Sequence, residues 1–264
     1  MKIVLDNRAL IKVSGEDSEV FLQSQFSNDI KQIQHKKIQI NAYCQHQGKI
    51  IALLWVFVES DYFYLSIPSE IKELVLSKLN MFKLMSKIEI EDLSNQFYQY
   101  GLIDEKNDYS FKINDNLSLL LSSEQIKAVK PFFYWEIACI NDKLPEIYRN
   151  NSDRFIPQAL NLDIKEIGVS FTKGCYPGQE VVARMHYLGK PKRRLFRFVS
   201  RFEVAIGDRL DVKNSKSLKS AGEVIRLANK DGKSHFLGVF EVNHINDEIF
   251  LNNDQNKLVN LIHD

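Results

Sequence analysis

The sequence contains few cysteines and no cysteine motif. Its 264 residues include only Cys44, Cys139 and Cys175, an odd number that is widely spaced and lacks a CxxC pair. Disulfide frameworks need paired cysteines, and structural zinc sites need closely spaced ligands. We therefore expect neither a disulfide framework nor a permanently bound metal, and a reducing cytoplasm is the expected setting.

Long apolar runs and an excess of charge are also missing. The most apolar stretch, residues 50–58 (IIALLWVFV), is far shorter than the roughly 20 residues of a membrane-spanning helix, so we predict a buried strand there. The first residues lack the apolar core of a signal peptide. The 35 basic and 34 acidic side chains leave a formal net charge of +1. The overall charge therefore favours neither nucleic acid nor a membrane as a partner.

What is present is a pattern of mixed helices and strands, followed by strands alone. Helices are predicted at 14–26, 69–83 and 125–140, the last with a start or kink at Pro131. Strands are predicted at 38–44, 50–58, 62–67, 87–92, 97–103 and 117–121. Beyond residue 189, short apolar runs alternate with turn residues, which predicts a small all-β barrel or sandwich.

Cys175 lies in a segment with strong turn chemistry, residues 173–180 (KGCYPGQE). Pro177 and Gly178 suit the second and third positions of a type II turn, the third of which requires a positive φ. The residue before a proline is restricted to extended backbone. The sequence therefore predicts a constrained loop around the thiol.

A helix is predicted directly after this loop, at residues 180–187, with an ion pair between Glu180 and Arg184 one turn apart. Cys175 thus precedes a helix amino end and is flanked by Lys173. Both features lower the pKa of a thiol and favour its thiolate.

Two interpretations of Cys175 stay open at this point: an activated thiol, or a small apolar side chain that fills a gap under the turn. A pair with His186 is not expected, because eleven residues, mostly helical at 1.5 Å each, place it about 10 Å or more away. The remaining histidines form no ligand-spaced cluster with the cysteines.

A second local feature is a cluster of cations at the start of the predicted all-β region. Its members are Lys190, Lys192, Arg193, Arg194, Arg197 and Arg201. They are either the solvated charges of one strand or a site for an anionic ligand or phosphate backbone. No aromatic RNA-binding signature accompanies them, so sequence-specific RNA recognition is not implied.

Four segments resemble one protein family along nearly the whole chain. Residues 169–196 (VSFTKGCYPGQEVVARMHYLGKPKRRLF) are similar to the signature of YgfZ-type folate-binding proteins, relatives of the glycine-cleavage T-protein, an aminomethyltransferase. Residues 13–29 (VSGEDSEVFLQSQFSND) resemble the opening helix of that family. Residues 42–50 (AYCQHQGKI) resemble its first hairpin, and residues 155–163 (FIPQALNLD) resemble the segment before the cysteine loop.

The resemblance implies an α+β, T-protein-like fold in three parts, with antiparallel sheets, helices and a C-terminal all-β barrel around a central folate channel. The expected domains are residues 1–45 with 125–188, residues 46–124, and residues 189–264.

The resemblance also implies a function: a tetrahydrofolate-binding accessory protein for the assembly or repair of iron–sulfur clusters, including those of enzymes that modify tRNA. Its expected partners are iron–sulfur client enzymes or assembly factors, with an anionic ligand or tRNA at residues 190–201. The implied functional residues around the thiol are Lys173, Cys175, Gln179, Glu180 and Arg184. The implied folate-binding residues are Arg8, Asn28, Trp135, Glu136 and Tyr176.

The sequence departs from the transferase pattern. Where aminomethyltransferases carry an acidic pair after the hairpin glycines, this chain has Ile51, Ala52 and Leu53, so proton transfer has no evident agent there. A conventional enzyme is therefore not expected. The alternatives are a one-carbon transferase with its carboxylate elsewhere, at Asp29 or Glu136, and a tRNA-binding module.

The pattern expected for the folate pocket is also altered. Glu136 lies one place early, Cys139 replaces a glycine, and Arg8 stands where some members carry a tryptophan. The resemblance thus implies a folate pocket of changed chemistry.

Overall fold

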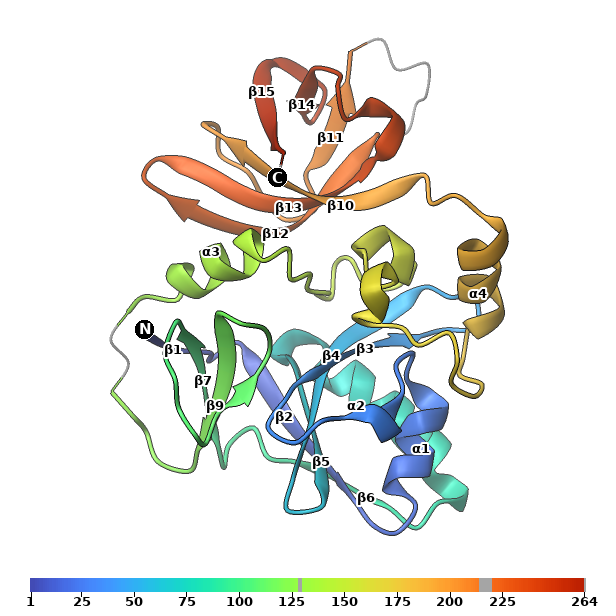
Figure 1. Ribbon diagram of the computed structural model, residues 1–264. Helices are drawn as coiled ribbons and strands as arrows, with labels where there is room; N and C mark the ends of the chain where they lie inside the picture. Colours follow the sequence, from blue (N-terminus) through green and yellow to red (C-terminus); the bar gives the residue numbers. More distant parts are fainter. Residues whose placement is uncertain (128–129, 214–219, 264) are drawn as a thin grey trace. The chain divides into compact units, whose positions relative to one another are not determined.

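The computed structural model describes residues 1–127, 130–213 and 220–263 (Figure 1). The chain forms two compact units. The first unit consists of Met1–Phe132, Ile147–Pro157 and Leu162–Arg184. The second unit consists of Phe133–Glu146, Gln158–Asn161 and Met185–Asp264.

A five-stranded antiparallel sheet organises the first unit. Its strands follow the order β3–β4–β5–β2–β6. Their bounds are β2 (Arg8–Ser14), β3 (Gln39–Cys44), β4 (Ile50–Glu59), β5 (Tyr62–Pro68) and β6 (Glu89–Asp92). The structure thus contains the predicted meander β3–β4–β5, and the apolar run is the buried strand β4. β2, which was not predicted, pairs with both β5 and β6.

Two helices pack on one face of this sheet. They are α1 (Ser18–Gln25) and α2 (Lys72–Phe82), and the short helices of this unit are η1 (Ile30–Gln32), η2 (Ser69–Ile71), η3 (Lys83–Met85) and η5 (Ile164–Glu166). Phe21 and Leu22 of α1 share a buried core with Val75 and Leu79 of α2 and with alternate residues of the sheet. This alternation is expected, because successive side chains of a strand point to opposite faces.

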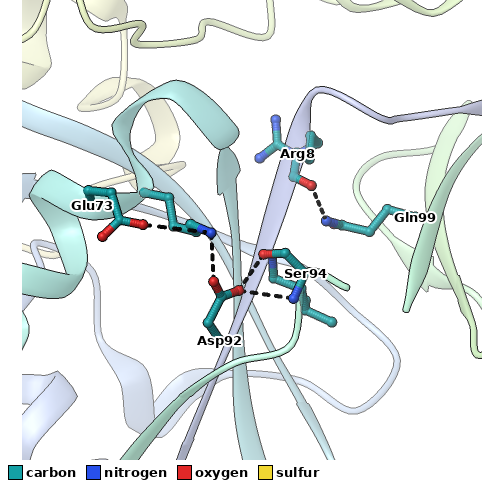
Figure 2. Close-up of polar contacts among 7 residues, drawn as sticks. Arg8, Glu73, Asp92, Ser94 and Gln99 are labelled. Atoms are coloured by element: carbon teal, nitrogen blue, oxygen red, sulfur yellow. Dashed lines mark hydrogen bonds and ion pairs between the residues drawn. The ribbon is translucent and has the colours of Figure 1, made fainter. Parts of the chain in front are cut away.

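A smaller sheet with the order β1–β7–β9–β8 completes the first unit. Its strands are β1 (Lys2–Val4), β7 (Tyr98–Ile103), β8 (Phe111–Lys112) and β9 (Leu117–Ser122). Gln99 of β7 donates from Nε2 to the Arg8 carbonyl of β2 at 3.1 Å, which ties the two sheets together (Figure 2). Lys72 of α2 pairs with Asp92 of β6 at 2.6 Å, and Figure 2 also shows Asp92 beside Ser94.

The second unit contains a closed antiparallel barrel with the order β10–β13–β12–β11–β14–β15. Its strands are β10 (Arg193–Ser200), β11 (Arg209–Val212), β12 (Gly222–Lys230), β13 (Lys233–Glu241), β14 (Ile249–Leu251) and β15 (Asp254–Ile262). Phe198, Phe236 and Phe240 fill the barrel interior with stacked and edge-on ring contacts. The predicted all-β region is therefore a barrel.

The remaining helices are α3 (Phe133–Asn141), α4 (Gln179–Leu188), η4 (Pro157–Leu160) and η6 (Val242–His244). α3 begins after Pro131, so the helix predicted over 125–140 is shorter than expected, and residues 128–129 within it lie outside the described residues. Proline is tolerated near the start of a helix but not inside it.

The predicted division within the first 188 residues differs from the observed one. A boundary between residues 45 and 46 would cut the five-stranded sheet, because β3 pairs with β4 across it and β2 pairs with β5. The structure instead assigns residues 133–146 and 158–161 to the barrel unit. Strand pairing between distant segments decides this division.

Candidate functional site

The loop around Cys175 contains the turn predicted from its sequence. Gln179 N–H donates to the Tyr176 carbonyl at 3.2 Å, and Gly178 has a φ of +83°. With Pro177 before the glycine, these features define a type II turn. α4 then begins at Gln179, one residue before the predicted start. We call residues 173–179 the Cys175 loop.

The Cys175 loop packs on the hairpin between β3 and β4 through backbone-to-backbone contact. A Cβ added at Gly178 would lie 2.6 Å from the Gly48 Cα and closer still to the Gln45 carbonyl oxygen. Gly48 also has a positive φ, of +75°. Only glycine combines this backbone conformation with such a close approach. The glycines of two distant motifs therefore form a single contact.

Lys173 anchors the other end of the Cys175 loop. Its buried ammonium donates to the carbonyls of Gln23 at 2.6 Å, Phe26 at 2.5 Å and Asn28 at 2.9 Å, at the end of α1. An ammonium has three N–H donors, so carbonyls accept from all of them. Burial lowers the pKa of Lys173 to about 8, against the attraction of Asp29. Lys173 is therefore a positioning residue, whereas the sequence predicted a charge acting on the thiol.

Ser27 and Asn28 make further hydrogen bonds to β3 and to the segment that leads to the loop. Ser27 Oγ donates to the Gly168 carbonyl at 2.6 Å, and Ser170 N–H donates to the Ser27 carbonyl at 3.0 Å. Asn28 Nδ2 donates to the carbonyls of Ile40 at 3.1 Å and Ile167 at 3.2 Å. Because both of its amide protons are used in this way, Asn28 acts within the scaffold.

Cys175 is exposed, although its neighbours Lys173 and Tyr176 are buried. Cys175 therefore does not fill a gap in the core. The other two cysteines are buried, and burial, with a smaller effect of Asp153, raises the pKa of Cys44 to about 12. Burial also raises the pKa of Tyr176, whose ring lies 5.3 Å from the Lys173 Nζ. The chain thus presents one thiol at the surface of a firmly held loop.

The polar residues that follow the turn differ in their exposure. Glu180 and Arg184 are exposed and Gln179 is half-buried. Within the described part of the chain, no ion pair joins Glu180 to Arg184, so the predicted pair is absent. Exposed pairs of this kind contribute little, because water competes for both charges. Within the described residues, these side chains form no hydrogen-bonded network with each other.

The sequence has relatives over most of its length, although no family model matches it. An uncharacterized protein of Haemophilus influenzae is 32% identical over 244 residues, covering 87% of this chain and 85% of that relative. Proteins named tRNA-modifying protein YgfZ from Colwellia psychrerythraea and Buchnera aphidicola are 28% and 26% identical over 260 and 263 residues. They cover 84% and 85% of this chain, and 79% and 82% of their own lengths are matched. The chain belongs to the YgfZ family.

The fold of this YgfZ-family chain is T-protein-like. The glycine cleavage system aminomethyltransferase T of Bartonella henselae superposes with a TM-score of 0.73 at 12% identity, over 100% of this chain and 84% of that protein. Together with the antiparallel sheets and the closed barrel, this match confirms the predicted fold class. The folate channel stays a prediction.

The YgfZ-family chain has no carboxylate at the hairpin positions where transferases carry an acidic pair. Ile51, Ala52 and Leu53 are all buried in the sheet. The alternative carboxylate Asp29 accepts hydrogen bonds from Gln23 Nε2 at 2.9 Å and from Lys31 N–H at 3.2 Å. Asp29 is therefore part of the turn after α1.

Arg8, predicted to bind folate, is a buried cation on β2. Its guanidinium stacks 3.6 Å from the ring centroid of Trp55 and donates to Ser66 Oγ at 2.8 Å and to the Ser66 carbonyl at 2.9 Å. Figure 2 shows Gln99 reaching its backbone carbonyl. The tryptophan that some members carry at the Arg8 position is thus replaced by a cation stacked on a tryptophan of β4.

Trp135 and Glu136, also predicted to bind folate, are buried on α3 in the second unit. Both carboxylate oxygens of Glu136 accept from Arg226 at 2.8 Å, and Arg226 Nη1 donates to the Leu144 carbonyl at 3.0 Å. This bidentate geometry is the strongest form of arginine–carboxylate pairing. Glu136 therefore fastens α3 to β12 of the barrel.

The cation cluster at residues 190–201 is divided by the alternation of β10. Arg193 and Arg197 lie on one face of the strand, and Arg194 lies on the other. Arg193 pairs with Glu241 at 3.1 Å, Arg197 donates to Asn141 at 3.3 Å, and Arg194 donates to the Gln158 carbonyl at 2.9 Å. The arginines of β10 are therefore divided between the two faces of the strand.

Sequence reasoning missed the residues that satisfy these buried polar groups. They are Ser27, Asn41, Ser66, Gln99 and Arg226, which are all buried. Single polar residues inside apolar runs, such as Arg226 in VIRLA, were the available signal, because a buried polar group requires a partner.

No metal-ligating group of three or more side chains occurs among residues 1–127, 130–213 and 220–263. Over the same residues, every helix is too short or too polar to cross a bilayer.

Proposed function

We propose that this protein is a tetrahydrofolate-binding accessory protein that maintains iron–sulfur enzymes, including those that modify tRNA. The observation that carries the proposal is the exposed Cys175 on a loop held at both ends by buried contacts. A thiol used only for packing would be buried, whereas one that meets a partner or a cluster must be accessible. Two relatives of this chain are named tRNA-modifying protein YgfZ. These names support a role in tRNA modification.

The residues present are compatible with folate. A pterin ring carries N–H donors and needs acceptors in a buried setting. Glu136 is buried, and its two oxygens retain lone pairs beyond those used by Arg226. The sequence resemblance to YgfZ-type folate-binding proteins implies the same ligand class. We place Trp135 and Glu136 among the residues that hold tetrahydrofolate, which would supply one-carbon or reducing chemistry.

A one-carbon transferase is disfavoured by the positions of the carboxylates. The hairpin positions are apolar and buried, Asp29 is held in a turn, and Glu136 is paired with Arg226. Each of these positions is thus apolar or already paired, whereas such a transfer needs a carboxylate within hydrogen-bond reach of the proton that it moves.

Two measurements test the proposal. Calorimetry of the full chain with tetrahydrofolate should give saturable binding, and the absence of heat and of thermal stabilisation at millimolar ligand would remove the folate part. In a strain that lacks its own YgfZ protein, wild type and Cys139→Ala should restore tRNA modification by an iron–sulfur enzyme, and Cys175→Ala should not. Equal rescue by Cys175→Ala at equal protein levels would contradict a role for the thiol.

A separate assay addresses the transferase alternative. Incubation of the chain with tetrahydrofolate and an aminomethyl donor should yield no methylene-tetrahydrofolate above a protein-free control. Turnover that survives Cys175→Ala would establish the transferase instead.

A further inference from the structure

A pocket of about 460 Å³ lies in the first unit, apart from the Cys175 loop. It is formed by the connection that runs from η1 into β3, by Ile113 and by the turn around η5. Its volume falls within the roughly 300–1,000 Å³ range of small-molecule sites. The pocket is therefore large enough for a compact metabolite.

The charge of this pocket is entirely positive. The ten residues that the structure describes around it are five isoleucines, three glutamines and two lysines, Lys37 and Lys165, and none carries a carboxylate. Both lysines are exposed, and over the described residues neither ammonium has a hydrogen-bond or ion-pair partner. Two uncompensated cations at one concave surface attract an anion.

The charge of Lys37 acts on one nearby carboxylate, Asp115, which is paired with a different lysine. The pKa of Asp115 is lowered first by its hydrogen bond with Lys112, at 2.7 Å, and last by the more distant charge of Lys37. Because Asp115 already has a close partner, the Lys37 ammonium is left for a ligand.

The backbone at the edge of the pocket is strained. Lys165 has φ +52° and ψ +25°, and the next residue, Glu166, has φ +52°. The left-handed region is uncommon for residues other than glycine and is energetically unfavourable for them. Strain of this kind gathers at ligand-binding segments, and here it includes a lysine that lines the pocket.

A larger pocket in the same unit provides a contrast. Its volume is about 590 Å³, and it is lined by three lysines together with Asp104, Glu105, Asp108 and Asp115. Its carboxylates outnumber its lysines, so it repels rather than attracts an anion. Charge, and not size, distinguishes the smaller pocket.

We propose that the smaller pocket binds a small anionic ligand through phosphate or carboxylate groups. Lys37 and Lys165 pair with the charge, and the amides of Gln32 and Gln34 donate hydrogen bonds to its remaining oxygens. Gln39 is already used, since it donates to the Asp29 carbonyl at 2.8 Å and accepts from Asn41 at 2.9 Å. The isoleucines contact the carbon body of the ligand.

The test measures thermal unfolding and calorimetric binding of the full chain with pyrophosphate and with citrate, at constant ionic strength. Saturable binding of at least one anion is expected, because a ligand that binds only the folded state raises the unfolding temperature. The variant Lys37→Gln/Lys165→Gln should raise Kd by about tenfold or more, as two charged hydrogen bonds are lost. Binding of pyrophosphate alone indicates a phosphate ligand, and binding of citrate alone indicates a polycarboxylate.

The matched controls are Lys31→Gln, next to the pocket in sequence, and Lys106→Gln, in the larger pocket. Both should leave Kd unchanged. Amide chemical shifts should change at residues 32–40 and 165–167 on titration. The proposal is overturned if neither anion binds at concentrations up to about 10 mM, which is high enough to detect a weak site. Equal weakening by Lys31→Gln or Lys106→Gln, or binding only to tRNA, would also overturn it.

Discussion

Gly178 packs its backbone directly against that of Gly48, so that a Cβ on Gly178 would lie 2.6 Å from the Gly48 Cα. One glycine belongs to the turn after Cys175 and the other to the hairpin between β3 and β4. The contact leaves no space for a side chain on Gly178, and a Cβ on Gly48 would lie only 3.1 Å from the Val181 Cβ. It therefore fixes the position of the Cys175 loop on the five-stranded sheet.

Gly178→Ala should destabilise the protein by about 2 kcal/mol or more, because alanine is strained at a positive φ and its Cβ meets backbone that cannot move away. Gly174→Ala is the matched control in the same loop, since a Cβ there meets nothing within 4 Å. It should change the free energy of unfolding by less than about 0.5 kcal/mol. Urea denaturation measures both, and equal effects would refute the contact.

Lys173 should make the free energy of unfolding depend on pH above neutrality. Its folded pKa of about 8 lies below the model-peptide value of 10.5. Between these two values the unfolded chain binds more protons, so this group alone makes the free energy of unfolding rise with pH. Relative to Lys173→Met, the wild type should gain stability above pH 8, at a slope approaching about 1.4 kcal/mol per pH unit.

The measurement for Lys173 is urea denaturation of both proteins from pH 7 to pH 10. Other groups that titrate in this range contribute equally in both proteins. Their contributions therefore cancel when the two free energies of unfolding are subtracted. Lys31→Met, at an exposed position, should show no such trend. A flat difference between wild type and Lys173→Met would contradict the burial of the ammonium. At pH 7, Lys173→Met should lower the free energy of unfolding by about 2 kcal/mol, because three carbonyls lose their donor.

Cys175 should be the thiol that reacts in the folded protein. A thiol-specific reagent should label about one thiol quickly in native buffer and the buried pair, Cys44 and Cys139, only after unfolding. Cys175→Ser should abolish the fast phase, and Cys139→Ser should leave it unchanged. Fast labelling that persists in Cys175→Ser would show that another cysteine is accessible.

The ion pair between Glu136 and Arg226 should behave as a buried pair. Glu136→Gln should destabilise the chain by about 3 kcal/mol, because it leaves the buried guanidinium without its countercharge. Replacing both residues, as in Glu136→Leu/Arg226→Met, should be less harmful than the single change. Glu241→Gln breaks the half-exposed pair with Arg193 and should cost less than about 1 kcal/mol. Similar losses for Glu136→Gln and Glu241→Gln would contradict this contrast.

Local chemistry made part of the site predictable. Pro177 and Gly178 restrict their own backbone, so the turn at Cys175 and the helix after it follow from a few neighbouring residues. The meander β3–β4–β5 was also predictable, because its strands are consecutive and joined by short turns. By contrast, β2 is buried on both faces, and its residues do not alternate between polar and apolar. β15 is largely polar. Neither sequence pattern therefore predicted a strand.

The sequence by itself determined the turn, the helix after it, the meander and the all-β character of the last region, because each depends on steric limits and periodicity within one short segment. The tertiary structure decided which groups meet. Lys173 reaches the carbonyl of Asn28, 145 positions earlier, and Arg226 reaches Glu136, 90 positions earlier. It also decided the partner of Arg193, through the register of β10 with β13. Burial and pairing of polar groups are properties of the folded chain, since only the packing of distant segments removes water from them.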